Sequence, residues 1–181
     1  MFKFEEKILL QQIKRGNQTA FSRLYDRYQD KIYRFIFFRV SNESLAQDLT
    51  SETFIKILQY LINGKEVENF QSFAYQVAKN LVIDFYRSRG QEEMPLDESI
   101  SENVSDEDVD EMLDEKFNLN QIESALGQVS NPYRDVLVLR FIEDLPFKEI
   151  AKTLNIKEDN ARMLAHRGLK MLRDKLGAPA K

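Results

Sequence analysis

Apolar residues in the first part of the chain recur at helical spacing. Between residues 20 and 40 they fall three or four positions apart, which places them on one face of a helix. That face contains Phe21, Leu24, Tyr25, Tyr28, Ile32, Phe35 and Ile36. Asn17 can cap this helix and Asn42 the next one, because their side-chain oxygens accept N–H groups of a first helical turn.

Two further helices are expected before residue 91. One spans about residues 43–61 and ends in the Asn63-Gly64 turn; the other spans about residues 70–89 and is closed by Gly90. The first should bury Leu45, Leu49, Thr53, Phe54, Ile57, Leu58 and Leu61. The second should bury Phe70, Phe73, Ala74, Val77 and Leu81. A short polar loop joins them.

Helical spacing returns after residue 117, with Ile122, Leu126 and Val129. Asn131 is expected to cap the next helix, with Pro132 at its first position. No strand pattern occurs, so the sequence predicts an all-α protein of two small helical domains. Their expected bounds are residues 1–90 and 118–177, with a linker over 91–117 and a tail over 178–181.

Charge divides along the same lines. Residues 1–90 carry 14 Lys and Arg against 10 Asp and Glu, residues 91–115 carry none against 12, and residues 116–181 carry 12 against 8. Two basic blocks suggest nucleic-acid contact at both ends of the chain. The acidic segment has no aromatic residue and few apolar ones, so we expect it to be a flexible linker.

Composition excludes several kinds of chemistry. The chain has no cysteine and a single histidine, His166, which argues against disulfides, a zinc site or imidazole catalysis. We therefore expect no metal, no cofactor, no small-molecule substrate and no enzymatic activity. No apolar run of about 18 residues and no cleavable leader pattern is present, so we expect no membrane insertion and a cytoplasmic location.

Residues 148–172 have the spacing of a helix-turn-helix. Asn155 suits the left-handed backbone of a tight turn, and Ile156 would plug that turn. In the second helix the inner side is expected to contain Ala161, Leu164, Ala165, Gly168 and Leu172. The outer side is expected to contain Asp159, Arg162, Met163, His166, Arg167 and Lys170.

This outer side predicts a recognition helix for the major groove. The expected DNA contacts are Lys157, Asn160, Arg162, Met163, His166, Arg167 and Lys170. Arg162 and Arg167 could each bind guanine or a phosphate. The alternative, a charged face on an ordinary amphipathic helix, is disfavoured by the turn spacing.

The helix over residues 70–89 has a polar outward line. It consists of Gln76, Lys79, Asn80, Ile83, Arg87 and Arg89. Together with Tyr75 and Tyr86, these residues would suit a strand with exposed bases, because aromatic faces stack and amides read base edges. These residues alone leave open the alternative of a solvated helix face.

Residues 20–40, 46–58 and 70–89 resemble region 2 of the extracytoplasmic-function (ECF) sigma factors of bacterial RNA polymerase, and residues 131–172 resemble region 4. The resemblance implies docking on the β′ clamp helices through Asp48, Ser51, Glu52 and Ile55. It implies capture of a flipped minus-ten base by Asn63, Lys65, Asn69, Gln76, Lys79, Asn80, Ile83, Arg87 and Arg89. The recognition helix would then read the minus-thirty-five element, without nucleotide hydrolysis.

The same resemblance implies core RNA polymerase, including its β flap, and promoter DNA as partners. ECF sigma factors commonly have an anti-sigma partner, which no residue here identifies. The chain departs from the family pattern at Phe73, where tryptophan is usual, and at Met163, where a small hydroxyl residue is common. Asp159-Asn160 stands for a usual Gly-Thr, and Gly168-Leu169 for Ala-Arg. These changes bear on the promoter sequence more than on the fold.

Three alternatives remain open. The acidic linker is either a simple tether or a mimic of nucleic acid in a basic channel of the polymerase. The helix-turn-helix could belong to a freestanding operator-binding regulator, which would have no use for a strand-capture block. A nuclease would need clustered carboxylates on a folded scaffold, and the dense acidic cluster lies in the linker.

Overall fold

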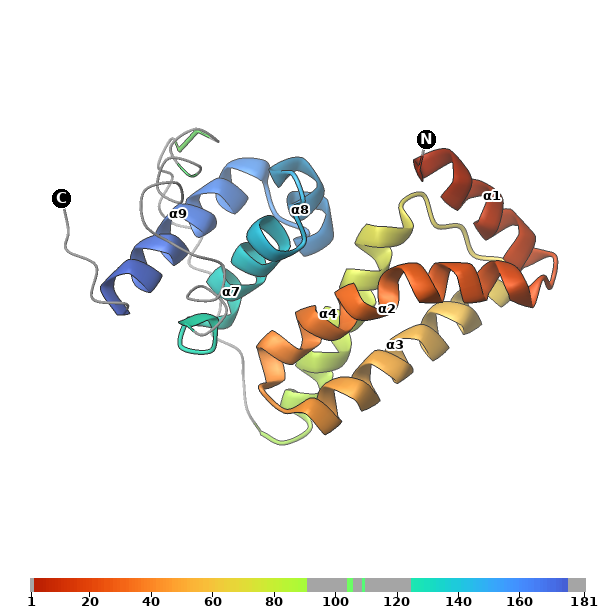
Figure 1. Cartoon of the computed structure of the whole chain (residues 1–181), viewed down its shortest axis with the longest axis horizontal. Coiled ribbons are helices and arrows are strands. Elements are labelled where there is room, and N and C mark those ends of the chain that lie inside the picture. Colours follow the sequence, from red (N-terminus) through yellow and green to blue (C-terminus); the bar gives the residue numbers. More distant parts are fainter. Residues whose placement is uncertain (1, 91–103, 106–108, 110–124, 176–181) are drawn as a thin grey trace. The chain divides into compact units, whose positions relative to one another are not determined.

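The computed structural model describes residues 2–90, 104–105, 109 and 125–175, which fall into two compact units, residues 1–91 and 92–181. All the regular elements in these ranges are helices, which confirms the all-α prediction (Figure 1). Within the same ranges, none of the helices has the length and apolar character needed to cross a membrane.

The first unit contains four helices: α1 (Phe2–Lys14), α2 (Gln18–Val40), α3 (Glu43–Ile62) and α4 (Phe70–Arg87). Helix α2 packs against the other three, and α3 packs also against α1 and α4. Asn17 and Asn42 cap α2 and α3 as predicted, through bonds from the backbone N–H groups of Ala20 (3.2 Å) and Leu45 (2.9 Å). Helix α1 was not predicted.

The core of this unit is built around aromatic contacts between α2 and α4. The rings of Phe35 and Tyr75 meet edge to face at 5.2 Å, and those of Tyr28 and Phe70 lie 5.1 Å apart. The predicted stripe of α4 is partly wrong, because Tyr75 is fully buried while Phe73 is half-buried. Tyr75 therefore presents no face to a nucleic-acid base.

The second unit contains α7 (Asn131–Leu137), a π-helical turn η1 (Val138–Ile142), α8 (Phe147–Leu154) and α9 (Glu158–Lys175). Asn131 is the first residue of α7 and not its cap, since Ser130 takes the extended cap position and makes no side-chain capping bond. Arg134 is buried and donates to the carbonyl oxygens of Val129 (2.6 Å) and Gly127 (3.0 Å), which ties α7 to the chain before it.

Most of the acidic segment lies outside the described residues, so its flexibility stays a prediction. The predicted tail, residues 178–181, lies outside them as well. Three of its residues are described: Val104, Ser105 and Val109. Val109 is fully buried.

Candidate nucleic-acid interfaces

The turn between α8 and α9 has the geometry that the sequence predicts. Asn155 adopts a left-handed backbone (φ 57°, ψ 49°), and its N–H donates to the carbonyl of Ala151. The N–H of Ile156 donates to the same carbonyl at 3.0 Å. Asparagine tolerates this conformation better than other residues with a β-carbon, so the turn can be tight.

Gly168 allows α9 to lie close to α7. A β-carbon added at this position would come within 2.9 Å of Leu137 Cδ1 and 3.3 Å of Tyr133 Cβ. Since α8 also packs against α9, the helix is held from two sides. The opposite face of α9 is thus presented in a fixed orientation relative to the rest of its unit.

The polar side chains predicted for this face are only partly exposed. Lys157 and Lys170 are exposed, and Asn160, His166 and Arg167 are half-buried. The prediction that Met163 lies on the outer face is wrong, because its side chain is 3% exposed. Two packing partners widen the buried arc of α9 beyond the stripe expected for a helix with one partner, and Met163 falls inside that arc.

Arg162 is engaged within its own helix. Its guanidinium lies 2.5 Å from Glu158 Oε1 and 3.0 Å from Asp159 Oδ1, and its central carbon lies 5.9 Å from the centroid of the Phe147 ring on α8. The side chain is 17% exposed. A bidentate contact with guanine would require these pairs to break, so the structure does not favour Arg162 as a base-reading residue.

The loop between α3 and α4, from Asn63 to Asn69, is the strand-capture loop that the family resemblance implies. Asn63 and Lys65 are exposed, whereas Asn69 caps α4 by accepting the N–H of Ser72 at 3.0 Å. Lys65 Nζ lies 5.0 Å from the centroid of the Tyr60 ring. Tyr60 in turn lies 4.6 Å from Phe73, ring to ring. These two half-buried rings offer the aromatic surface that the sequence assigned to Tyr75.

The six residues of the outward line predicted for α4 are all at least partly exposed. Asn80, Arg87 and Arg89 are exposed, and Gln76, Lys79 and Ile83 are half-buried. Arg87 lies 3.6 Å from Asp84, and Arg89 stacks 4.1 Å from the ring centroid of Phe85. This line therefore combines polar and apolar side chains, and its two arginines lie near the C-terminal end of α4.

The outer face of α3 combines acidic and apolar exposure. Asp48, Ser51 and Glu52 are exposed, and Ile55 is 55% exposed. Glu52 makes one ion pair, with Lys56 at 3.4 Å. A large exposed aliphatic side chain beside carboxylates is suited to contact with a protein surface that is basic and partly apolar.

Comparison with known families matches both units. Residues 24–92 match the model "Sigma-70 region 2", and residues 119–172 match "Sigma-70, region 4". The chain belongs to the ECF sigma factors. Its function is to direct RNA polymerase to promoters and so initiate transcription, and the freestanding regulator is not supported.

Several curated sigma factors are similar over most of this chain. The ECF sigma factor SigW of Bacillus subtilis is 29% identical, over 92% of this chain and 94% of SigW. BldN of Streptomyces coelicolor is 28% identical over 91% of this chain, which spans 63% of BldN. A solved structure, that of CnrH in complex with the cytosolic domain of CnrY, has a TM-score of 0.71 at 21% identity and covers 97% of this chain and 99% of that one. This last likeness concerns the fold.

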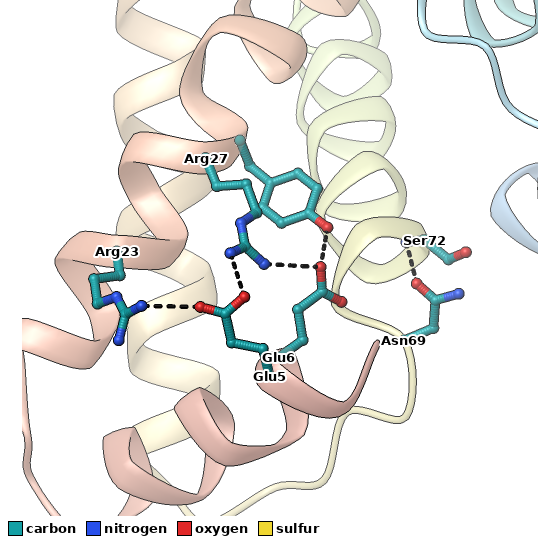
Figure 2. A network of polar contacts seen from close by, with 7 residues as sticks. Glu5, Glu6, Arg23, Arg27, Asn69 and Ser72 are labelled. Atoms are coloured by element: carbon teal, nitrogen blue, oxygen red, sulfur yellow. Dashed lines mark hydrogen bonds and ion pairs between the residues drawn. The ribbon is translucent and has the colours of Figure 1, made fainter. Parts of the chain in front are cut away.

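One polar network of this sigma factor was not predicted from the sequence. Glu5 on α1 accepts hydrogen bonds from Arg23 (2.9 Å) and Arg27 (2.8 Å) on α2, and Glu6 accepts one from the Tyr28 hydroxyl (Figure 2). The bond from Arg27 lowers the pKa of Glu5 and raises that of Arg27. Burial, followed by the bond to Glu6, raises the pKa of Tyr28. The adjacent acids and the Arg23–Arg27 spacing were the available signal.

Proposed function

We propose that this sigma factor contacts its partners through three surfaces. The outer face of α3, with Asp48, Ser51, Glu52 and Ile55, docks on the β′ clamp helices of core polymerase. The strand-capture loop and the outward line of α4 receive the unpaired minus-ten strand. Helix α9 reads the minus-thirty-five element in the major groove.

The observation that carries this proposal is that one chain combines a helix-turn-helix with a separate exposed loop beside aromatic rings and amides. A helix-turn-helix serves double-stranded DNA. An exposed loop beside aromatic rings and amides serves a strand whose bases are unpaired, because such bases can stack and present their edges. A protein that only bound an operator would need the first surface and not the second.

Within α9 we propose that Lys157, Asn160, His166, Arg167 and Lys170 meet the DNA. Arg162 is left out of the base-reading set because its charge is paired with Glu158 and Asp159. Met163 is left out because it is buried. Residues 1–90 thus serve polymerase docking and the minus-ten element, and residues 118–177 serve the minus-thirty-five element and the β flap.

The remaining parts of the proposal concern partners and location. We infer that an anti-sigma protein binds this chain, as the family resemblance implies; CnrH, which shares the fold, was solved in complex with the cytosolic domain of CnrY. The chain acts in the cytoplasm as a regulatory subunit without catalytic activity of its own.

Run-off transcription with core polymerase on a library of promoter sequences tests the proposal. We expect transcripts only when both proteins are present, from templates that share two sequence elements, and weak DNA binding by the sigma factor alone. Tight binding of the free chain to a two-fold symmetric site, with no effect on transcription by core polymerase, would contradict it.

A further inference from the structure

Helix α1 has no part in the three surfaces proposed above. It nevertheless reaches the strand-capture loop by two separate routes. One starts at Glu6, near the N-terminal end of α1, and the other at Lys14, its last residue. A helix that supports a loop from two directions restricts the conformations that the loop can adopt.

The first route runs through the core. Glu6 accepts the hydrogen bond from the Tyr28 hydroxyl and lies 3.7 Å from Arg27 Nη1 (Figure 2). Tyr28 is 5% exposed, and its ring packs 5.1 Å from that of Phe70, which is fully buried. Phe70 is the first residue of α4 and directly follows Asn69, the last residue of the loop. The contacts therefore lead from α1 to the C-terminal end of the loop.

The second route is direct. Lys14 Nζ lies 3.5 Å from Oε1 of Glu66, a residue in the middle of the loop. A cleft of about 220 Å³ separates α1 from the loop, with Leu10 and Gln11 on one side and Val67 and Glu68 on the other. The Lys14–Glu66 pair joins the two sides of this cleft.

We propose that α1 is a positioning element for the minus-ten strand. Glu6, acting through Tyr28 and Phe70, and Lys14, acting through Glu66, hold the strand-capture loop in the conformation that receives an unpaired base. This inference rests on the proposed role of the loop. A loop that is already ordered does not have to be ordered on binding, so loosening its supports lowers affinity for the strand without removing a DNA contact.

The first test uses Tyr28→Phe in holoenzyme. This change keeps the ring against Phe70 and deletes the hydroxyl that reaches Glu6. We expect affinity for a fluorescent single-stranded oligonucleotide, carrying the minus-ten sequence selected in the promoter library, to fall about two- to thirtyfold. Affinity for core polymerase and for a double-stranded minus-thirty-five fragment should not change, whereas a general loss of structure would weaken all three.

Glu5→Gln is the matched control. It removes the ion pairs of Glu5 with Arg23 and Arg27 but leaves Glu6 in contact with both Tyr28 and Arg27. Its strand affinity should stay within about twofold of the wild type. An equal loss in Glu5→Gln and Tyr28→Phe would show that attachment of α1 in general is what matters, and would overturn the route through Tyr28.

A charge exchange tests the second route. Lys14→Glu should weaken strand binding. Adding Glu66→Lys to Lys14→Glu should raise strand affinity by more than Glu66→Lys changes it in the wild type, because the two residues are coupled. Strict additivity of the two changes would overturn the role of this pair.

Failure of the inference can be told apart from failure of the proposed function. If wild-type holoenzyme does not bind the single strand, the function proposed for the loop is wrong. If the wild type binds it and both Tyr28→Phe and Lys14→Glu bind it equally well, α1 does not position the loop, and the function proposed for the loop stands. Thermal unfolding of each variant checks that it is folded.

Discussion

Arg162 and Arg167 both lie on the polar side of α9 by helical spacing, and Arg162 is paired with two carboxylates of its own helix. Glu158 and Asp159 stand four and three positions before Arg162, the spacing at which helical ion pairs form, and both pairs are present. Acids at the N-terminal end of a helix are also favoured by the helix dipole. The sequence alone therefore indicates this pairing. Because its charge is paired, Arg162 is less suited to the DNA contact that its outward position alone would suggest.

Arg162→Ala should weaken promoter binding by holoenzyme to a similar extent on all sequences. The substitution leaves two carboxylates near the DNA phosphates without their cation, and such repulsion carries no information about bases. We expect a loss of about 0.5 to 1 kcal/mol that shrinks as salt is raised. Filter-binding or gel-shift titrations over a panel of minus-thirty-five variants measure it.

Arg167→Ala is the comparison on the same helix. If Arg167 reads a base, its loss should cost about 1 to 3 kcal/mol of discrimination at one promoter position. A position-specific loss in Arg162→Ala would show that Arg162 leaves its acidic partners and reads a base after all.

At the scale of helices, the caps and the tight turn could be predicted from the sequence, whereas which side chains are buried could be predicted only in part. Asn17, Asn42 and Asn155 behave as expected because a cap or a left-handed turn depends on one residue and its immediate backbone. Burial depends on how many helices cover a given face. Tyr75 and Met163 were misplaced for this reason, since α4 and α9 each pack against two partners. Helix α1 was not predicted, although its buried residues Leu9, Leu10 and Ile13 have helical spacing.

The next prediction concerns the outer face of α3, which is proposed to bind core polymerase. Asp48→Lys should abolish holoenzyme formation, because it places a cation where a basic partner surface is expected. The protein should remain folded, since Asp48 is exposed and exposed substitutions usually change stability by less than about 0.5 kcal/mol. Co-purification with core polymerase and thermal unfolding measure the two effects.

Asp26→Lys is the matched control for charge. It makes the same substitution at an exposed position on a different helix, α2. Its holoenzyme formation should equal that of the wild type. Retained polymerase binding by Asp48→Lys would refute the docking role of that face.

Over the whole molecule, the division of charge matters more than its total. A net charge of −4 would suggest a protein that avoids nucleic acid, but residues 1–90 and 116–181 each have an excess of 4 cations. The 12 acids of residues 91–115 account for the difference. The function proposed for this sigma factor would use both basic blocks, one for each promoter element, and leaves the acidic segment between them to be explained.

Replacing the acids of residues 91–115 by asparagine and glutamine decides between the two interpretations of that segment. If the acids imitate a nucleic-acid strand in a basic channel of the polymerase, neutralising them removes favourable Coulomb interaction. Affinity for core polymerase should then fall, most strongly at low salt, because screening already weakens such interactions at high salt. The ratio of abortive to full-length RNA should change as well, since a strand mimic must be displaced when the transcript grows. A simple tether predicts neither effect: unchanged affinity for core polymerase and an unchanged RNA ratio would refute the mimic and leave the segment as a connection between the two units.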